Sequence, residues 1–184
     1  MTRSELEHLI RASGAIANDN ELIVIGSQSI LGQFPEAPAA LRASMETDLY
    51  PKNKPELAEL IDGSIGEGSY FHEEFGYYAQ GVGPKTAVLP AGWGKRLIRI
   101  DNVNTNGIAG LCLEVHDLAI SKYVASRPKD RDFTRGLARH GLTRRQTLKR
   151  RLDKTTLTGA DKKRIRSVID ADFRKSTGKK TPAA

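Results

Sequence analysis

Two acidic side chains separated by one residue are the feature of this sequence that most directly suggests chemistry. Glu46 and Asp48 lie in the segment METDLYP, which alternates and then stops at Pro51, so it predicts a β-strand. Side chains two positions apart in a strand project from the same face, so the two carboxylates are expected together. Like charges this close are unfavourable unless a cation lies between them, and Mg²⁺ prefers such oxygen ligands. An exposed edge strand with an acidic face is the alternative interpretation.

A glycine-serine turn precedes this pair. The apolar run ELIVIG predicts a buried strand that ends at Gly26, and Ser27 opens the short helical segment SQSILGQ. Glycine permits a tight turn and a close approach of the backbone. The N–H groups at the start of a helix, together with the Ser27 hydroxyl, can bind a phosphate group. Taken alone, such a turn is more often only a turn.

The remaining patterns predict the elements that must position these residues. A helix is expected over residues 4–17 with Ser4 as its cap, and another runs from a cap at Asn53 to Gly63. The glycine-rich stretch 65–76 is expected to be a loop. Further short strands are expected at 75–82 and 85–90 (joined as a hairpin), at 95–101 and at 110–115. Helices are expected at 117–127, 129–141, 143–152 (with Thr143 as cap) and 158–175. The expected fold is therefore α+β (α/β-like), a mixed β-sheet flanked by helices with a basic helical C-terminal region.

Charge divides unevenly along the chain. Residues 1–121 carry a net charge of −7 and residues 122–184 a net charge of +14. This asymmetry predicts a polyanionic or acidic partner for the C-terminal third, and nucleic acid is the usual polyanion. Basic helices that stay soluble or pack against the acidic half explain it equally well. No apolar run approaches the length of a membrane span, so no membrane partner is expected. The single cysteine, Cys112, indicates a reducing, cytoplasmic location and reads as a buried thiol.

The order strand, Gly-Ser turn, helix and strand with an acid-x-acid pair resembles the polymerase-β nucleotidyltransferase superfamily. The stretch HDLAISKYVASRPKDRDF, with METDLYP, GYYAQGVGPKTAVLPAGW and NTNGIAGLCLEVHDLAISK, is similar to small bacterial members related to abortive-infection toxins. The resemblance covers residues 20–140. It divides the chain into a nucleotidyltransferase-like domain at 1–141, a basic helical appendage at 142–176 and a disordered tail at 177–184.

The resemblance also implies roles for particular residues. Gly26 and Ser27 would contact the phosphates of a nucleoside triphosphate (NTP), and Glu46 and Asp48 would be the catalytic carboxylates that coordinate one or two Mg²⁺ ions. Lys122 and Arg127, on the helix that follows the sheet, could pair with phosphate oxygens.

Two departures from the family pattern stand out. Ser27 and Glu46 are separated by 18 residues, more than is typical, and glutamate replaces the more usual aspartate as first ligand. A third carboxylate, which active members carry on a neighbouring strand, has only Asp101 and Glu74 as candidates.

The sequence thus predicts a cytoplasmic enzyme that transfers a nucleoside monophosphate from an NTP to a hydroxyl of RNA, protein or a small molecule. Residues 142–175 would contact tRNA or another nucleic acid, and an antitoxin protein is a further candidate partner. The alternative is a catalytically degenerate protein that keeps the fold and binds nucleic acid or a protein partner.

Overall fold

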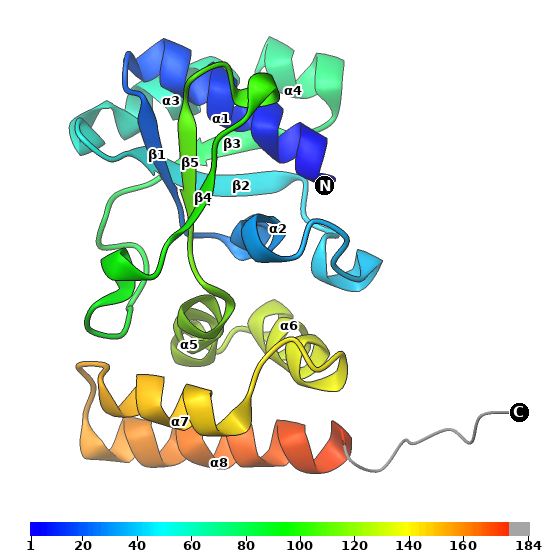
Figure 1. Cartoon of the computed structure of the whole chain (residues 1–184), viewed down its shortest axis with the longest axis vertical. Coiled ribbons are helices and arrows are strands. Elements are labelled where there is room, and N and C mark those ends of the chain that lie inside the picture. Colours follow the sequence, from blue (N-terminus) through cyan, green and yellow to red (C-terminus); the bar gives the residue numbers. More distant parts are fainter. Residues whose placement is uncertain (177–184) are drawn as a thin grey trace, which may run out of the picture. The chain divides into compact units, whose positions relative to one another are not determined.

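A computed structural model describes residues 1–176, which form two compact units (Figure 1). Unit 1 comprises residues 1–87 and 93–114; unit 2 comprises residues 88–92 and the chain from residue 115 onward. Residue 141, the expected end of the nucleotidyltransferase-like domain, falls inside unit 2. The expected disordered tail, 177–184, lies outside the described residues. No helix within residues 1–176 is both long enough and apolar enough to cross a membrane.

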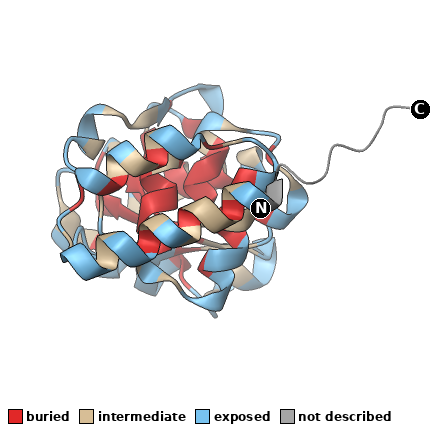
Figure 2. Ribbon diagram, turned by 90° about the horizontal axis from the view of Figure 1, so that it is seen from below, coloured by how far each residue is buried: buried red, intermediate tan, exposed pale blue. Residues whose placement is uncertain are grey.

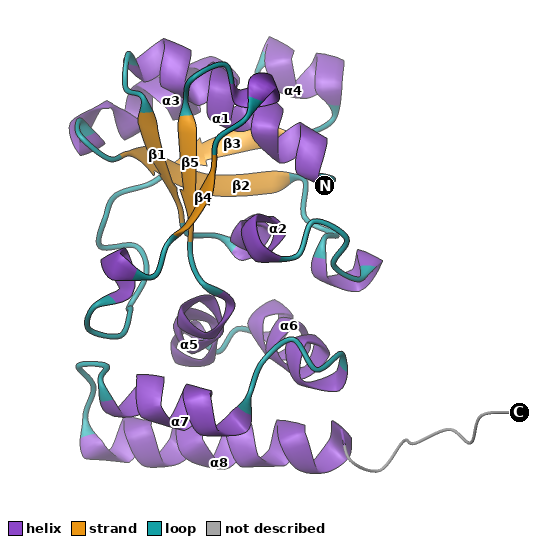
Figure 3. Ribbon diagram, in the orientation of Figure 1, coloured by secondary structure: helices purple, strands orange, loops and turns teal. Residues whose placement is uncertain are grey.

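Unit 1 is built on a five-stranded mixed sheet with the strand order β3-β2-β1-β5-β4 (Figure 3). The β1–β5 and β2–β3 pairs are parallel, and the β1–β2 and β4–β5 pairs are antiparallel. This mixed sheet with flanking helices confirms the predicted α+β fold class. The strands are β1 (Glu21–Val24), β2 (Glu46–Pro51), β3 (Tyr78–Gly81), β4 (Ile98–Ile100) and β5 (Ala109–Cys112).

The helices of unit 1 are short apart from the first. They are α1 (Arg3–Ala17), α2 (Ile30–Gln33), α3 (Ala58–Ile65) and α4 (Tyr70–Phe75), with 3₁₀ turns η1 (Ser27–Ser29), η2 (Ala39–Leu41), η3 (Pro55–Leu57), η4 (Trp93–Lys95) and η5 (Val103–Thr105).

Four local predictions in unit 1 are wrong. The expected loop 65–76 contains α4, and the expected strand at 85–90 is irregular. Helix α1 is capped by Thr2, which forms a capping box with Glu5, rather than by Ser4. Asn53 does not cap a helix, because its side chain donates instead to Asp19 at 2.8 Å.

Helices α1 and α3 cover one face of the sheet. A Cβ atom at Gly110 would lie 2.3 Å from Cδ1 of Ile10, on α1, and one at Gly81 would lie 1.8 Å from the carbonyl oxygen of Ala58, on α3. Strand β2 sends the fully buried Thr47 to this covered side. Its neighbours Glu46 and Asp48 alternate with Thr47 and therefore project from the opposite face.

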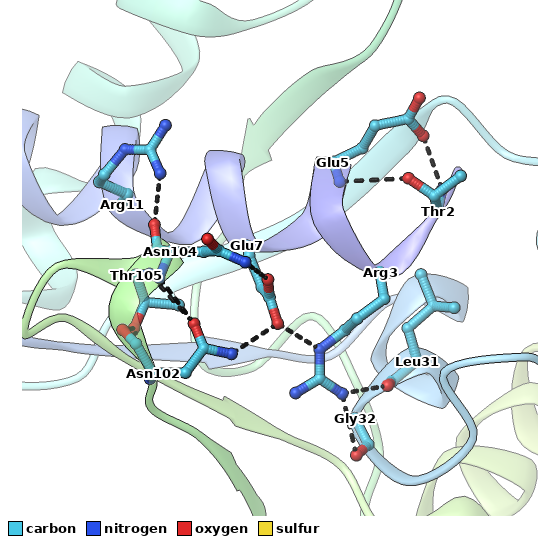
Figure 4. Close-up of polar contacts among 10 residues, drawn as sticks. All are labelled: Thr2, Arg3, Glu5, Glu7, Arg11, Leu31, Gly32, Asn102, Asn104 and Thr105. Carbon is cyan, nitrogen blue, oxygen red and sulfur yellow. Dashed lines mark hydrogen bonds and ion pairs between the residues drawn. The ribbon is translucent and has the colours of Figure 1, made fainter.

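A polar network on α1 anchors α2 and the segment around η5 (Figure 4). The nearly buried Glu7 accepts hydrogen bonds from Arg3 at 2.9 Å and from Asn102 and Asn104 at 2.8 Å. Burial raises the pKa of Glu7, but these donors outweigh it and hold the pKa below its ordinary value. Arg3 also donates to the carbonyl of Leu31 at 2.6 Å, so α1 fixes the end of the segment that begins at the glycine-serine turn.

Unit 2 is a helical assembly within the described residues. It consists of α5 (Val115–Ala125), α6 (Pro128–Arg139), α7 (Arg145–Asp153) and α8 (Gly159–Ser176). Helix α5 is buried or half-buried from Val115 to Val124, whereas α6 and α7 carry both buried and exposed residues (Figure 2). The break predicted at Pro128 is confirmed. Thr143 does not cap α7, which starts after Arg144 without a side-chain cap. The fully buried core residues include Leu118, Ile120, Leu137, Leu148, Leu152 and Ile169.

Candidate active site

The glycine-serine turn lies directly against the second carboxylate of β2. Antiparallel pairing continues beyond β1, because the Ile25 N–H donates to the Asp48 carbonyl at 3.0 Å. A Cβ atom at Gly26 would lie only 2.1 Å from Oδ2 of Asp48. Gly26 has a φ of −76°, a conformation open to any residue. Glycine is therefore needed here for the close approach of Asp48 rather than for backbone freedom.

Hydrogen bonds within the turn hold its shape. The Ser29 hydroxyl and N–H both donate to the Gly26 carbonyl, at 2.8 and 3.0 Å. The helical segment that follows is a 3₁₀ turn and then the four-residue α2, so its dipole is small. Ser27 is half-buried, so its hydroxyl is a better phosphate donor than the helix end.

Gln28 is a polar residue of this turn that the sequence reasoning did not single out. Its side chain is fully buried, and neither its amide nitrogen nor its amide oxygen has a hydrogen-bond partner among the described residues. An unpaired buried amide costs free energy that a bound polar group can recover. The sequence pattern that could have indicated Gln28 is a glutamine between two serines directly after an apolar strand.

Glu46 and Asp48 lie on the face of the sheet opposite α1 and α3, together with residues of β3. The parallel register sets Glu46 opposite Tyr78 and Asp48 opposite Gln80. Burial raises the pKa of the Tyr78 hydroxyl, and the nearby charges of Glu46 and Asp48 raise it further. Within residues 1–176, the Asp48 carboxylate forms no hydrogen bond or ion pair. The Asp48 carboxylate is therefore available to a cation.

A third carboxylate does not complete the pair. On β3, the strand next to β2, the positions in register are Tyr78 and Gln80. Asp101 follows β4, at the far edge of the sheet, and is paired with Arg99 at 2.7 Å. No three His, Cys, Asp or Glu residues within 1–176 are grouped so that they could hold a metal ion. The two carboxylates suit a single hard cation whose other ligands come from a bound molecule.

The two predicted phosphate-binding cations belong to unit 2, where both contact Asp130. Lys122 Nζ lies 3.6 Å and Arg127 Nε lies 2.7 Å from the carboxylate oxygens of this buried aspartate. Burial raises the pKa of Asp130, but the hydrogen bonds of Arg127 and the charge of Lys122 outweigh it, so the pKa lies below normal. Pro128 occupies the first position of α6, and the Asp130 carboxylate accepts a hydrogen bond from the Arg127 N–H at 3.2 Å, which caps the start of the helix. The role of Asp130 was therefore readable in the sequence as Pro at the first helical position and Asp two residues later.

Other candidates have structural roles. Four aromatic residues of α4 and the start of β3 are packing partners. Phe71, Phe75 and Tyr77 surround His8, whose Nδ1 lies 2.8 Å from the Tyr77 hydroxyl, and the tilted Tyr78 ring packs against His72. Cys112 is buried, and burial raises the pKa of its thiol to about 12, so it is not a nucleophile.

A mixed sheet, a glycine-serine turn against a strand carboxylate and a second acid on the same face define a nucleotidyltransferase-like protein. A family model covers residues 4–177, and the chain belongs to that family, DUF6036, described as a nucleotidyltransferase of unknown function. No curated protein and no solved structure matches the chain significantly.

Proposed function

We propose that this protein is a Mg²⁺-dependent enzyme that transfers a nucleoside monophosphate from an NTP to an acceptor hydroxyl. The observation that carries the proposal is the contact between Gly26 and the unpaired carboxylate of Asp48, with Glu46 on the same face. Membership of a nucleotidyltransferase family supports the same reaction class.

Each residue of the turn and strand has a role in this proposal. Gly26 leaves room beside Asp48, and the Ser27 hydroxyl donates to a phosphate oxygen. Glu46 and Asp48 hold Mg²⁺, which when bound neutralises triphosphate charge and polarises the reacting phosphoryl group. The buried amide of Gln28 is a donor and an acceptor for a polar group of the nucleotide.

Lys122 and Arg127 are proposed to contribute positive charge toward phosphate oxygens. Both already contact Asp130, so a phosphate would share these cations with a buried carboxylate. Arg127 keeps an exposed fraction of 57% and is the better candidate of the two, since the Lys122 side chain is only 12% exposed.

The direct test is transfer of label from each α-labelled NTP to RNA, protein and small-molecule acceptors by the full chain with Mg²⁺. Glu46→Ala and Asp48→Ala should each lower transfer at least about a hundredfold, the scale of losing one preorganised electrostatic group at a transition state. Glu59→Ala, an exposed carboxylate on α3, is the matched control and should retain activity. No binding and no transfer with any NTP would overturn the proposal.

A second function is favoured by one specific observation, the missing third carboxylate beside Glu46 and Asp48. Without a base to activate the acceptor, nucleotide binding could survive in a protein that no longer catalyses transfer. This alternative predicts nucleotide binding with no labelled product. Antitoxin pairing and the abortive-infection toxin branch remain predictions; growth arrest on expression that Asp48→Ala relieves would support them.

A further inference from the structure

Unit 2 has a large excess of positively charged residues. Residues 88–92 and 115–176 contain 18 lysines and arginines but only seven acidic residues, all aspartates, for a net charge of +11. A count alone does not define a surface, because paired charges cancel locally. The placement of the seven aspartates therefore decides how much positive charge reaches the surface.

Three of the seven aspartates are buried and engaged inside the unit. Asp117 is fully buried and lies 3.1 Å from Arg151. Asp130 is held by Arg127 and Lys122, as described above. Asp172 accepts a hydrogen bond from the Tyr123 hydroxyl at 3.0 Å. None of these carboxylates contributes an exposed negative charge.

The other four aspartates lie nearer the surface, and each is paired with a cation. The pairs are Asp132 with Arg135 at 3.1 Å, Asp153 with Arg166 at 2.5 Å, Asp161 with Arg164 at 3.6 Å, and Asp170 with Arg145 at 2.6 Å and Lys149 at 2.8 Å. Every carboxylate of unit 2 within the described residues is thus either buried or paired with a cation.

Seven cations of the described part of unit 2 are exposed and form no ion pair. They are Lys129, Arg131, Arg139, Arg144, Arg150, Lys154 and Lys163. On α6, residues 131, 135 and 139 repeat every four positions, so they share one helical face. At about 1.5 Å of rise per residue they recur roughly every 6 Å along that face. The result is a surface with exposed positive charge and no unpaired negative charge.

Unit 2 also lacks the apolar patch that a protein partner would use. The large hydrophobic side chains exposed in the described residues are Met45, Leu60, Tyr70, Phe75, Val88 and Val103, and none of these lies on α5–α8. Protein–protein interfaces have an apolar, desolvated centre, whereas nucleic-acid interfaces are polar and strongly positive. The surface therefore fits a phosphodiester backbone better than an acidic protein.

We propose that the helices of unit 2 bind the phosphate backbone of nucleic acid through these unpaired cations. Recognition through the backbone is independent of base sequence and depends strongly on salt. The proposal goes beyond the proposed function, because binding requires no transfer chemistry.

Binding of fluorescent oligonucleotides to the full chain, followed by anisotropy between about 50 and 200 mM salt, tests this proposal. Single- and double-stranded RNA and DNA probes distinguish the preferred nucleic acid. Arg139→Gln/Arg150→Gln should weaken binding about tenfold and reduce the salt slope by roughly 1 to 2. The matched control is Lys85→Gln/Lys95→Gln, which removes the same charge from exposed, unpaired lysines of unit 1 and should leave affinity unchanged.

Three results would overturn the proposal: no binding to any probe, binding without salt dependence, or equal weakening in the two double variants. Displacement of the probe by polyglutamate at matched charge concentration would also overturn it, since that outcome indicates an acidic protein as the partner. Asp48→Ala should bind nucleic acid normally even if it abolishes nucleotidyl transfer, so this proposal and the proposed function can fail separately.

Discussion

Asp48 of unit 1 and the aspartates of unit 2 have opposite surroundings. In unit 2 every described aspartate contacts a cation or a hydroxyl, including the fully buried Asp117. In unit 1, Asp48 is half-buried against Gly26 and has no hydrogen bond or ion pair within residues 1–176. A carboxylate that lies close to the backbone and has no partner does not stabilise the fold. We therefore expect it to take part in binding a ligand. The difference separates the structural acids of unit 2 from the acid that we propose to be functional.

Stability measurements on Asp117 and Asp48 give the largest expected contrast. Asp117→Ala should lower the free energy of unfolding by about 3–5 kcal/mol, because it leaves Arg151 beside a buried site without its carboxylate. Asp48→Ala should change it by less than about 1 kcal/mol, or raise it, because repulsion from Glu46 is relieved. Urea unfolding followed by circular dichroism measures both. Equal destabilisation by Asp117→Ala and Asp48→Ala would contradict this prediction. If Asp117→Ala does not fold, Asp117→Asn provides a milder variant.

Gly26→Ala tests the close contact on which the site depends. The new methyl group would meet the Asp48 carboxylate, so stability should fall by about 1–3 kcal/mol, the usual range for overpacking. In an Asp48→Ala background the same substitution should cost clearly less, since the clashing oxygen is gone. A double-mutant cycle in urea measures this coupling. Additive effects would show that Gly26 and Asp48 are not in contact.

Much of this account could be predicted from sequence. Alternation placed Glu46 and Asp48 on one strand face, and the apolar run before Gly26 gave β1. Both are local patterns, fixed by the two-residue period of a strand. The hydrogen bond from the Arg127 N–H to Asp130 is equally local, and Pro128 at the first helical position with Asp130 two residues later indicates it.

What sequence could not provide was register. The contact of Gly26 with Asp48, and the positions of Tyr78 and Gln80 beside the acids, follow from pairing between segments far apart in the chain. Two short segments were also predicted wrongly from their composition. The stretch 85–90 has β-forming residues but pairs with no strand, and α4 forms where glycines predicted a loop, because Ser69 caps it and Gly76 ends it.

Substitution of Gln28 is expected to have smaller effects, which differ in sign: stability should rise and nucleotide affinity should fall. Gln28→Met keeps the side-chain volume and removes two unsatisfied polar atoms, so stability should rise by about 1 kcal/mol. Nucleotide affinity should fall, because the amide is lost as a partner for the ligand. Thermal unfolding and nucleotide titration of the same variant check both halves. A stable variant with undiminished affinity would remove Gln28 from the site.

The smallest expected effect is the pH dependence of the α7–α8 contact. Hydrogen bonds from Arg145 and then Lys149 lower the pKa of Asp170 from its ordinary value of 3.8 to about 2. Because the folded pKa is depressed, this stabilisation is complete above about pH 4 and is lost as pH falls toward 2. Between those pH values the wild type should lose more stability than Asp170→Asn. Parallel loss in the two proteins would contradict the pairing.

The central claim is that Asp48, beside the Gly26 turn, binds a divalent cation together with a nucleotide. Isothermal titration of the full chain with NTP, with and without Mn²⁺, tests it most directly for wild type and Asp48→Asn. The account predicts that wild-type binding requires Mn²⁺ and that Asp48→Asn weakens it at least about tenfold, the scale reached when even an outer-shell partner of a metal is lost, with unfolding unchanged. Binding that is equally tight without Mn²⁺, or in the Asp48→Asn variant, would contradict it.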